Sequence, residues 1–133
     1  MRVALLYNLA ENAPQPNPYA PHDILYELDH PKNIEAYEKA LALNPKNVNV
    51  IVDQGTCYRG IGKFDKAVEL YRKAIKIDPS FPNAHRNLGV VLAYDLHDAK
   101  QALPEFRRYL ELVPDAKDAD AIKQTIRDLS SAK

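Results

Sequence analysis

The chain has 133 residues, and its 18 Lys+Arg balance its 18 Asp+Glu to a formal net charge of zero. One domain of this length buries roughly two thirds of its unfolded surface, and zero net charge excludes a field that would draw the whole molecule to nucleic acid or to an anionic membrane. The single cysteine excludes an intramolecular disulfide and any multi-cysteine metal site. A chain without a disulfide fits a reducing compartment, so the cytoplasm is the expected location.

Residues 1–30 are predicted to form an extended N-terminal arm. Pro14, Pro16, Pro18 and Pro21 exclude regular helix and favour polyproline-like chain. Ahead of them, residues 1–9 are apolar and are compatible with a short strand or with an apolar arm that docks on the rest of the chain. They lack the clean cleavage site of a signal peptide, so we expect none.

Three tripeptides, residues 43–45, 77–79 and 112–114, each end in proline. Pro45, Pro79 and Pro114 lie 34 and then 35 residues apart. The same shift superposes Gly55 on Gly89. A period of about 34 residues is typical of two antiparallel helices that stack on copies of themselves, because neither helix buries its apolar face alone.

This period divides residues 31–133 into stacked helical units. Residues 31–45 carry only the second helix of a unit, residues 48–81 and 82–114 each form a full helix–turn–helix repeat, and residues 115–130 form a polar-backed capping helix. The prediction is therefore an all-α solenoid of two full repeats with a preceding half repeat.

Local signals set the helix ends. Residues 60–62, Gly-Ile-Gly, are predicted to close the first helix of the first full repeat, and Asp65 to cap or charge the start of the second. The next repeat is imperfect, because one residue is inserted within residues 94–101 and Pro104 falls inside its second helix. Proline removes a backbone hydrogen bond, so we expect an irregular entry before Glu105.

The first full repeat places small residues, aromatics and a closing proline at Gly55, Tyr58, Ala67, Tyr71, Ala74 and Pro79. With this pattern, residues 31–133 resemble the tetratricopeptide repeat family, although Ile51 stands where that family usually has tryptophan. The resemblance implies a right-handed helical solenoid that acts as a non-enzymatic scaffold for protein–protein interaction.

The resemblance also implies a concave groove lined by the first helix of each repeat. Its side chains carry over to Asn49, Val52, Asp53, Thr56, Arg59, Asn83, Arg86, Asn87 and Val90. Polar side chains of this mixture suit hydrogen bonding to an extended peptide or a helix of a partner protein, and the two valines would add apolar contact. One subtype of the family clamps a C-terminal carboxylate, but Val52 and Thr56 occupy places that need Lys and Asn, so that mode is disfavoured.

No catalytic, cofactor or metal site is predicted. Residues 55–63 are rich in glycine, but Phe64 stands where a phosphate loop needs Ser or Thr. The acids Asp115, Asp118 and Asp120 lack the glycine and glutamate of a calcium loop and suit the positive end of the last helix instead.

The remaining reactive and charged side chains fit structural roles. Cys57 and His85 are expected to pack between helices, since no paired histidine spacing and no cysteine cluster points to a metal. The basic residues of the second helices are expected to face solvent. They are Arg72, Lys73, Lys76, Arg107 and Arg108.

Two other interpretations remain open from sequence. The half repeat leaves an apolar face without its partner helix, which predicts either cover by the N-terminal arm or self-association into an oligomer. Residues 1–53 also resemble the opening of ATP-grasp ligases of the D-alanine–D-alanine ligase type, which predicts strands at residues 1–8 and 48–52.

Overall fold

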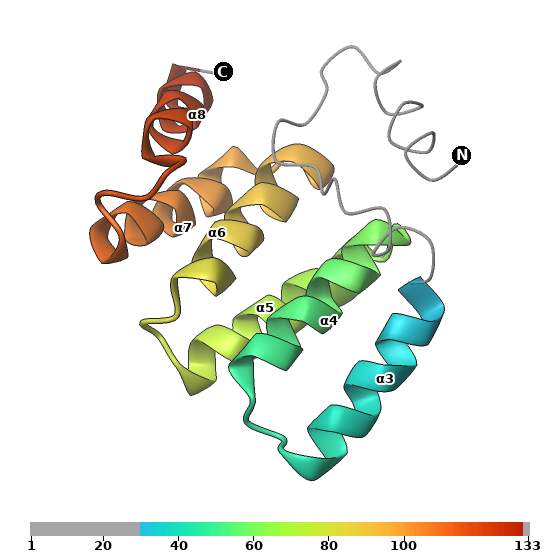
Figure 1. The fold of residues 1–133 in the computed structure, drawn as a ribbon. Helices are drawn as coiled ribbons and strands as arrows, with labels where there is room; N and C mark the ends of the chain where they lie inside the picture. Colours follow the sequence, from blue (N-terminus) through green and yellow to red (C-terminus); the bar gives the residue numbers. More distant parts are fainter. Residues whose placement is uncertain (1–29, 132–133) are drawn as a thin grey trace.

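A computed structural model of the chain describes residues 30–131 (Figure 1). These residues form six α-helices and one π-helical turn, and no strand occurs among them. In chain order they are α3 (His30–Leu43), α4 (Val48–Gly60), α5 (Phe64–Ile77), α6 (Pro82–Val90), η1 (Val91–Asp95), α7 (Ala99–Leu112) and α8 (Ala119–Ser131).

Each helix packs against the next one along the chain, from α3 through to α8, and α4 also contacts α6 (Figure 1). The predicted all-α repeat solenoid is therefore confirmed, with α4–α5 and the α6–η1–α7 segment as its two full units. Residues 1–29 lie outside the described residues, so the separation of an N-terminal arm from the repeats stays a prediction. No helix of residues 30–131 is long and apolar enough to cross a membrane.

The ends of α4 follow from local chemistry. The Asn47 side chain accepts a hydrogen bond from the backbone N–H of Val50 at 3.3 Å and so caps the first turn. Gly62 has a φ of +83°, the left-handed conformation that glycine adopts without strain, and the Lys63 N–H donates to the Tyr58 carbonyl at 2.9 Å. The predicted closure at residues 60–62 is confirmed.

The strand predicted at residues 48–52 is wrong, because α4 is helical from Val48 onward. The β-branched residues in this segment favour a strand locally, but Ile51 and Gly55 recur at helical spacing and both are buried. Packing against the neighbouring helices overrides the local preference. The ATP-grasp interpretation loses its second strand, and its first lies outside the described residues.

The extra residue of the second full repeat lies in η1. A π-helical turn accommodates one more residue than an α-helical turn, and here the Leu96 N–H donates to the Val91 carbonyl five residues back. The insertion explains the uneven period, since Gly55 and Tyr71 are 16 residues apart whereas Gly89 and Phe106 are 17 apart.

His97 ends this turn in a strained conformation, with a φ of +54°. It occupies the place that Gly62 holds in the preceding repeat, and the following Asp98 N–H donates to the Leu92 carbonyl at 2.7 Å. Because a side chain disfavours this backbone region, His97→Gly is expected to raise the free energy of unfolding by about 0.5–1 kcal/mol. Urea denaturation measures the change, and Lys100→Gly, inside α7, is the control that should lower stability instead.

The irregular entry predicted before Glu105 is wrong, because α7 runs unbroken from Ala99 with Pro104 inside it. Asp98 caps this helix by accepting a hydrogen bond from the Gln101 N–H at 3.2 Å. Pro104 has no N–H to donate to the Lys100 carbonyl, and both residues are exposed, so water can replace the missing donor.

Two glycines bring the helices of each repeat close together. A Cβ built on Gly55 would lie 2.8 Å from the Tyr71 ring, and one on Gly89 would lie 2.9 Å from the Phe106 ring. Tyr71 and Phe106 are fully buried at the centre of the core. Each unit therefore uses the same pairing of a glycine on its first helix with an aromatic ring on its second.

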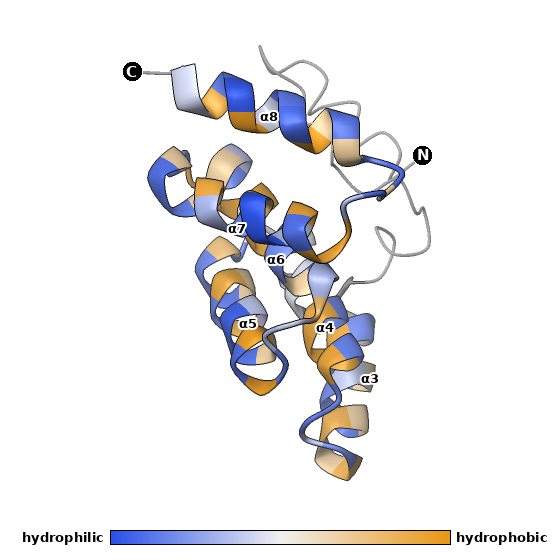
Figure 2. Cartoon of the chain, turned by 90° about the vertical axis from the view of Figure 1, so that its left-hand side faces the viewer, coloured by the Kyte–Doolittle hydropathy of each residue, from blue (hydrophilic) through white to orange (hydrophobic). Residues whose placement is uncertain are grey.

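The last helix closes the stack as a cap, as predicted. α8 buries Ile122 against the core, and Figure 2 shows the apolar side of this helix turned toward α7. Lys123, Gln124 and Arg127 are exposed on its other side. Asp120 lies in its first turn, which confirms the acidic start.

Candidate functional site

The residues predicted to line the groove lie on α4 and α6, and the surface they share is called here the first-helix face. Asn49, Asp53 and Asn83 are exposed on it. The rest of the polar set, Thr56, Arg59, Arg86 and Asn87, is half-buried. Their spacing of three and four residues puts the members from each helix on one side of that helix.

Val52 and Val90 lie in the core beneath this face. They are 4% and 3% exposed and pack within the apolar cluster of the two repeats. So little surface remains on either side chain that they cannot supply much apolar contact to a partner. The candidate site therefore consists of the polar residues of the first-helix face.

Arg59 joins the two full repeats across this face. Its guanidinium, at the end of α4, donates from Nε to Oδ2 of Asp95 in η1 at 2.5 Å, and from Nη2 to Oδ1 of the same carboxylate at 3.4 Å. Two bonds to one carboxylate fix the orientation of the guanidinium as well as its position.

Arg86 makes the equivalent link from the second repeat to the cap. Its Nε donates to Oδ2 of Asp118 at 2.7 Å, and the Tyr109 hydroxyl donates to Oδ1 of the same carboxylate at 2.7 Å. Arg86 Nη1 also donates to the Asn87 side-chain oxygen at 3.3 Å. Asp118 was expected to stabilise the positive N-terminal end of α8. Its carboxylate instead accepts hydrogen bonds from α6 and α7 and so links both helices to the cap.

Two opposing effects set the pKa of the Asp118 carboxyl. Burial alone would raise the pKa of this carboxyl, but hydrogen bonds from Arg86 and Tyr109, together with the arginine charge, hold it below its usual range. The same surroundings raise the pKa of Tyr109 to about 12, first by burial and then by the neighbouring Asp118 carboxylate.

We expect Asp118 to stabilise the fold at neutral pH and to lose that contribution in acid. Because its folded pKa lies below its unfolded value, the contribution is complete above the unfolded pKa of about 3.8 and is lost as the pH falls through the folded pKa. In Arg86→Ala the burial remains without the cation, so the Asp118 pKa should rise. Carboxyl carbon NMR titration measures both values, and an unchanged pKa in the variant would contradict this assignment.

Thr56 is engaged inside its own repeat. Its hydroxyl lies 2.8 Å from the Tyr71 hydroxyl and donates to the Val52 carbonyl at 3.1 Å. Burial raises the pKa of Tyr71 to about 12, so this phenol stays protonated and can donate to Thr56. Asp53, one turn before, has no such partner among residues 30–131, and desolvation by burial raises its pKa.

The buried histidine holds the second repeat together. His85 Nδ1 lies 2.8 Å from Glu105 Oε1, and Nε2 lies 2.7 Å from the Pro79 carbonyl, which confirms the predicted packing role. Cys57 is likewise fully buried. Among residues 30–131, no three His, Cys, Asp or Glu side chains come together as a metal site would require.

Sequence reasoning missed the acids that fix the two arginines. Asp95 lies in the π-helical turn, beyond the point where the repeat loses its regular period, and Asp118 precedes α8 by one residue. Tyr109 stands where the repeat pattern has alanine elsewhere. Only the stacking of successive units shows which charges meet.

Comparison with known proteins gives two matching family models. One, described as TPR repeat, matches residues 55–93, and the other, described as tetratricopeptide repeat, matches residues 30–69. Together they span α3, α4, α5 and α6 and end inside η1.

Similar curated proteins are larger than this chain. It is 37% identical over 92 residues to the protein O-mannosyl-transferase TMTC1 of Mus musculus, a match that covers 66% of this chain and 10% of that protein. It is 31% identical over 86 residues to small glutamine-rich tetratricopeptide repeat-containing protein 2 of Mycosarcoma maydis, covering 65% and 24%. The chain thus spans a quarter or less of the length of these relatives.

Solved structures share the fold. The first TPR of Spaghetti (RPAP3), bound to the HSP90 peptide SRMEEVD, has a TM-score of 0.69 at 23% identity and covers 76% of this chain and 79% of that one. The TPR2B domain of yeast Sti1, in a complex with pHsp70, has a TM-score of 0.71 at 19% identity, covering 79% and 86%. The translocator chaperone SycD of Yersinia enterocolitica has a TM-score of 0.72 at 14% identity, covering 96% and 83%.

Proposed function

The chain belongs to the tetratricopeptide repeat family, and on that premise we propose that its first-helix face binds an extended peptide or a helix of a partner protein. The role is that of a non-enzymatic scaffold. Transferase activity, which the name of one relative carries, is not assigned here, because the match covers only 10% of that protein. The cytoplasmic location stays a prediction.

The observation that carries the proposal is the set of polar groups left available on α4 and α6. Asn49 and Asn83 are exposed at equivalent positions, 34 residues apart. Asn87 lies one turn after Asn83, and no other side chain or backbone group of the described residues accepts from its amide nitrogen. Side-chain amides both donate and accept, so a row of them can pair with the backbone of a peptide whatever its side chains are.

The ion pairs of this face favour binding by a preformed surface. Arg59 and Arg86 are each fixed by a carboxylate from the next element of the stack. The Arg59–Asp95 pair crosses from α4 to η1 and holds the two first helices in register before a partner arrives, and the Arg86–Asp118 pair fixes α6 against the cap. A surface that does not have to be ordered on binding loses less entropy.

The same ion pairs argue against an acidic peptide. The similar first TPR of Spaghetti (RPAP3) is bound to the peptide SRMEEVD, which has acidic residues near its end. Here both arginines of the first-helix face are neutralised by Asp95 and Asp118, while Asp53 is exposed. We therefore infer that the partner segment is neutral or basic.

The experiment is selection of binding peptides from a random dodecapeptide display library on the intact chain, followed by titration of one selected peptide. Asn83→Ala combined with Asn87→Ala should weaken its binding roughly tenfold, as the loss of central interface contacts does. The control is Lys73→Ala with Arg107→Ala on the second helices, where both side chains face solvent. Circular dichroism checks that both variants remain helical.

Equal weakening in the control variant would contradict the proposal, because it would place the peptide elsewhere. Binding of the synthetic peptide SRMEEVD at micromolar concentration, with NMR shifts at Asn83 and Asn87, would support the face as the binding site but contradict the inference that the partner segment is neutral or basic.

Self-association is a second candidate, favoured by one observation. Leu43, at the end of the half-repeat helix α3, is 90% exposed, the most exposed of the large apolar side chains in the described residues. If it belongs to an interface between copies, the intact chain should show a concentration-dependent mass in sedimentation equilibrium that Leu43→Glu abolishes. A single monomer mass at all concentrations would remove this candidate.

A further inference from the structure

Among residues 30–131, helix α3 stands at one end of the stack and packs mainly against α4 (Figure 1). Its equivalent in the next unit, α5, packs against both α4 and α6. The opposite end of the stack is closed by the cap α8. In a stacked-repeat protein, an end without a cap exposes the apolar surface that a neighbouring helix would otherwise bury.

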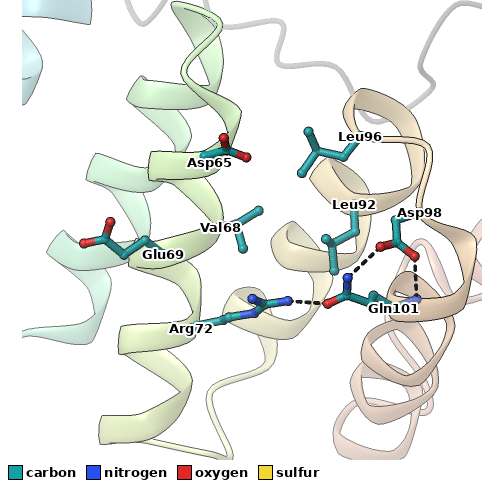
Figure 3. A pocket seen from close by; sticks show the side chains of 8 residues that line it. All are labelled: Asp65, Val68, Glu69, Arg72, Leu92, Leu96, Asp98 and Gln101. Carbon is teal, nitrogen blue, oxygen red and sulfur yellow. Dashed lines mark hydrogen bonds between the residues drawn. The ribbon is translucent and has the colours of Figure 1, made fainter.

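The side of α3 that contacts the next unit is fully packed. Ile34 and Val68 are equivalent residues, 34 apart, and both are buried. Figure 3 shows the Val68 side chain directed toward Leu92 of the following unit. Leu41 and its equivalent Ile75 also match, since both are half-buried and pack against the core. The contact of α3 with the next unit therefore repeats that of α5.

The other side of α3 is open where the same side of α5 is buried. In α5 this side is centred on Tyr71, which meets Gly55 of its own first helix α4. Its members recur at a spacing of three or four residues, and all are buried: Ala67, Leu70, Tyr71 and Ala74. Their equivalents in α3 are half-buried or exposed: Asn33, Ala36, Tyr37 and Ala40. At the end of the row, Leu43 is 90% exposed, whereas its equivalent Ile77 is half-buried.

The difference between α3 and α5 is confined to this row. Every other residue from 34 to 42 has the same burial as the residue 34 places later. What α3 lacks is therefore the cover that a first helix gives. The apolar members of the row are called here the α3 outer face; they are Ala36, Tyr37, Ala40 and Leu43.

The segment in register with a first helix is unsuited to that place. Residues 14–26 precede α4 by one period of 34 residues, and they contain Pro14, Pro16, Pro18 and Pro21. Pro21 stands where the next unit has Gly55, the residue that lets paired helices approach closely. Proline inside a helix removes a backbone hydrogen bond and clashes with the preceding turn. The α3 outer face therefore needs a different occupant.

Residues 1–10 have the composition and the reach to cover this face. Eight of them are apolar: Met1, Val3, Ala4, Leu5, Leu6, Tyr7, Leu9 and Ala10. Residues 11–29 join them to the start of α3. A fully extended linker of this length spans about 60 Å, whereas the 14 residues of α3 extend over about 21 Å. The linker thus allows residues 1–10 to reach any part of the face.

The tether also favours this segment over a second copy of the chain. A tethered segment competes at an effective concentration on the order of 1 mM, whereas a second copy in a micromolar solution competes at roughly a thousandth of that. Covering Leu43 and the exposed part of Tyr37 removes apolar surface from water, which favours whichever apolar occupant is most available.

From this placement we propose that residues 1–10 pack on the α3 outer face and take the place of the missing first helix. Their apolar side chains cover Leu43 and Tyr37, and the small side chains of Ala36 and Ala40 let the segment lie close to α3. The chain then caps both ends of its own stack, with α8 at one end and its first residues at the other. Self-association through Leu43 would require this segment to leave the face.

The test measures the reactivity of a thiol placed on the α3 outer face of the intact chain. Ala36→Cys is treated with Ellman's reagent, and the unsubstituted chain gives the background from Cys57. Replacing three leucines of the first segment, Leu5→Ser with Leu6→Ser and Leu9→Ser, should raise the Ala36→Cys rate at least tenfold because the cover is released. Circular dichroism checks that helix content is unchanged.

Two controls isolate the effect. Three serines in the linker, Asn12→Ser with Gln15→Ser and Asn17→Ser, should leave the Ala36→Cys rate slow. A thiol at an exposed position of α8, Ala121→Cys, should react at the same rate with and without the leucine substitutions.

Three results would overturn the proposal. The first is an Ala36→Cys rate that the leucine substitutions do not change, because residues 1–10 then do not cover the face. The second is an equal increase in the linker control, which would mean that the apolar side chains of the segment are not the cover. The third is a rate that falls as protein concentration rises, because a second copy would then protect the thiol.

Discussion

Replacing Phe106 by alanine is expected to lower the free energy of unfolding by about 3–5 kcal/mol. The ring is fully buried and packs against Gly89 of the neighbouring helix α6. Its removal leaves a cavity at the centre of the second full repeat, and the contacts on both sides of the ring are lost together. Guanidinium denaturation followed by circular dichroism measures the loss, and a change below about 1 kcal/mol would show that the site collapses around the cavity.

The same contact predicts that Gly89→Ala changes stability in opposite directions depending on whether the Phe106 ring is present. In the wild type a Cβ at this position would lie 2.9–3.0 Å from three ring atoms of Phe106, so Gly89→Ala should destabilise by about 1–3 kcal/mol of overpacking, less about 1 kcal/mol gained in helix propensity. In the Phe106→Ala background the ring is absent, and Gly89→Ala should stabilise. Additive effects in this double-mutant cycle would mean that the glycine is not selected by the ring.

The Cys57 thiol is expected to react about a thousandfold more slowly in the folded chain than in the unfolded one. Burial, and then the nearby Asp53 carboxylate, raise its pKa from 9.0 to about 12, which lowers the thiolate fraction at pH 8 by about three orders of magnitude. The Cys57 side chain, on α4, is also fully buried, so a reagent cannot reach it without local opening. The rate of colour release from a disulfide reagent such as Ellman's measures this directly, in buffer and in denaturant.

A matched control moves the only thiol to the surface. Cys57→Ser with Ser130→Cys places it at an exposed position of α8, where it should react in the folded chain as fast as a free thiol. Rapid labelling of wild-type Cys57 without denaturant would mean that α4 opens readily. The pKa shift also predicts a stability term that is complete below pH 9 and is lost as the pH rises toward 12, since the unfolded thiol releases its proton first.

The repeat architecture could be predicted from the sequence because each of its signals is local or periodic. Gly62 closes α4 through its own backbone conformation, and Gly55 and Gly89 mark the close approach of paired helices by recurring at the same place in each unit. These properties depend on a residue and its neighbours within one turn or one repeat.

The candidate site was only partly predictable, since its geometry arises between units. The helical spacing placed Val52 and Val90 with the polar residues of the first-helix face, but both side chains are buried in the apolar core of the two repeats. Asp95 and Asp118, which fix the two arginines, lie where the repeat changes length or ends. Pro104 shows the reverse case, because a strong local signal against helix leaves α7 unbroken at an exposed position, where water can replace the missing donor.

The π-helical turn η1 also bears on how such arrays can be joined. The extra residue is taken up between Gly89 and Phe106, and these two residues still meet as Gly55 and Tyr71 do in the shorter unit. A splice between modules of unequal length is therefore best made before this turn, where one residue can be added or removed while all downstream helices stay in phase.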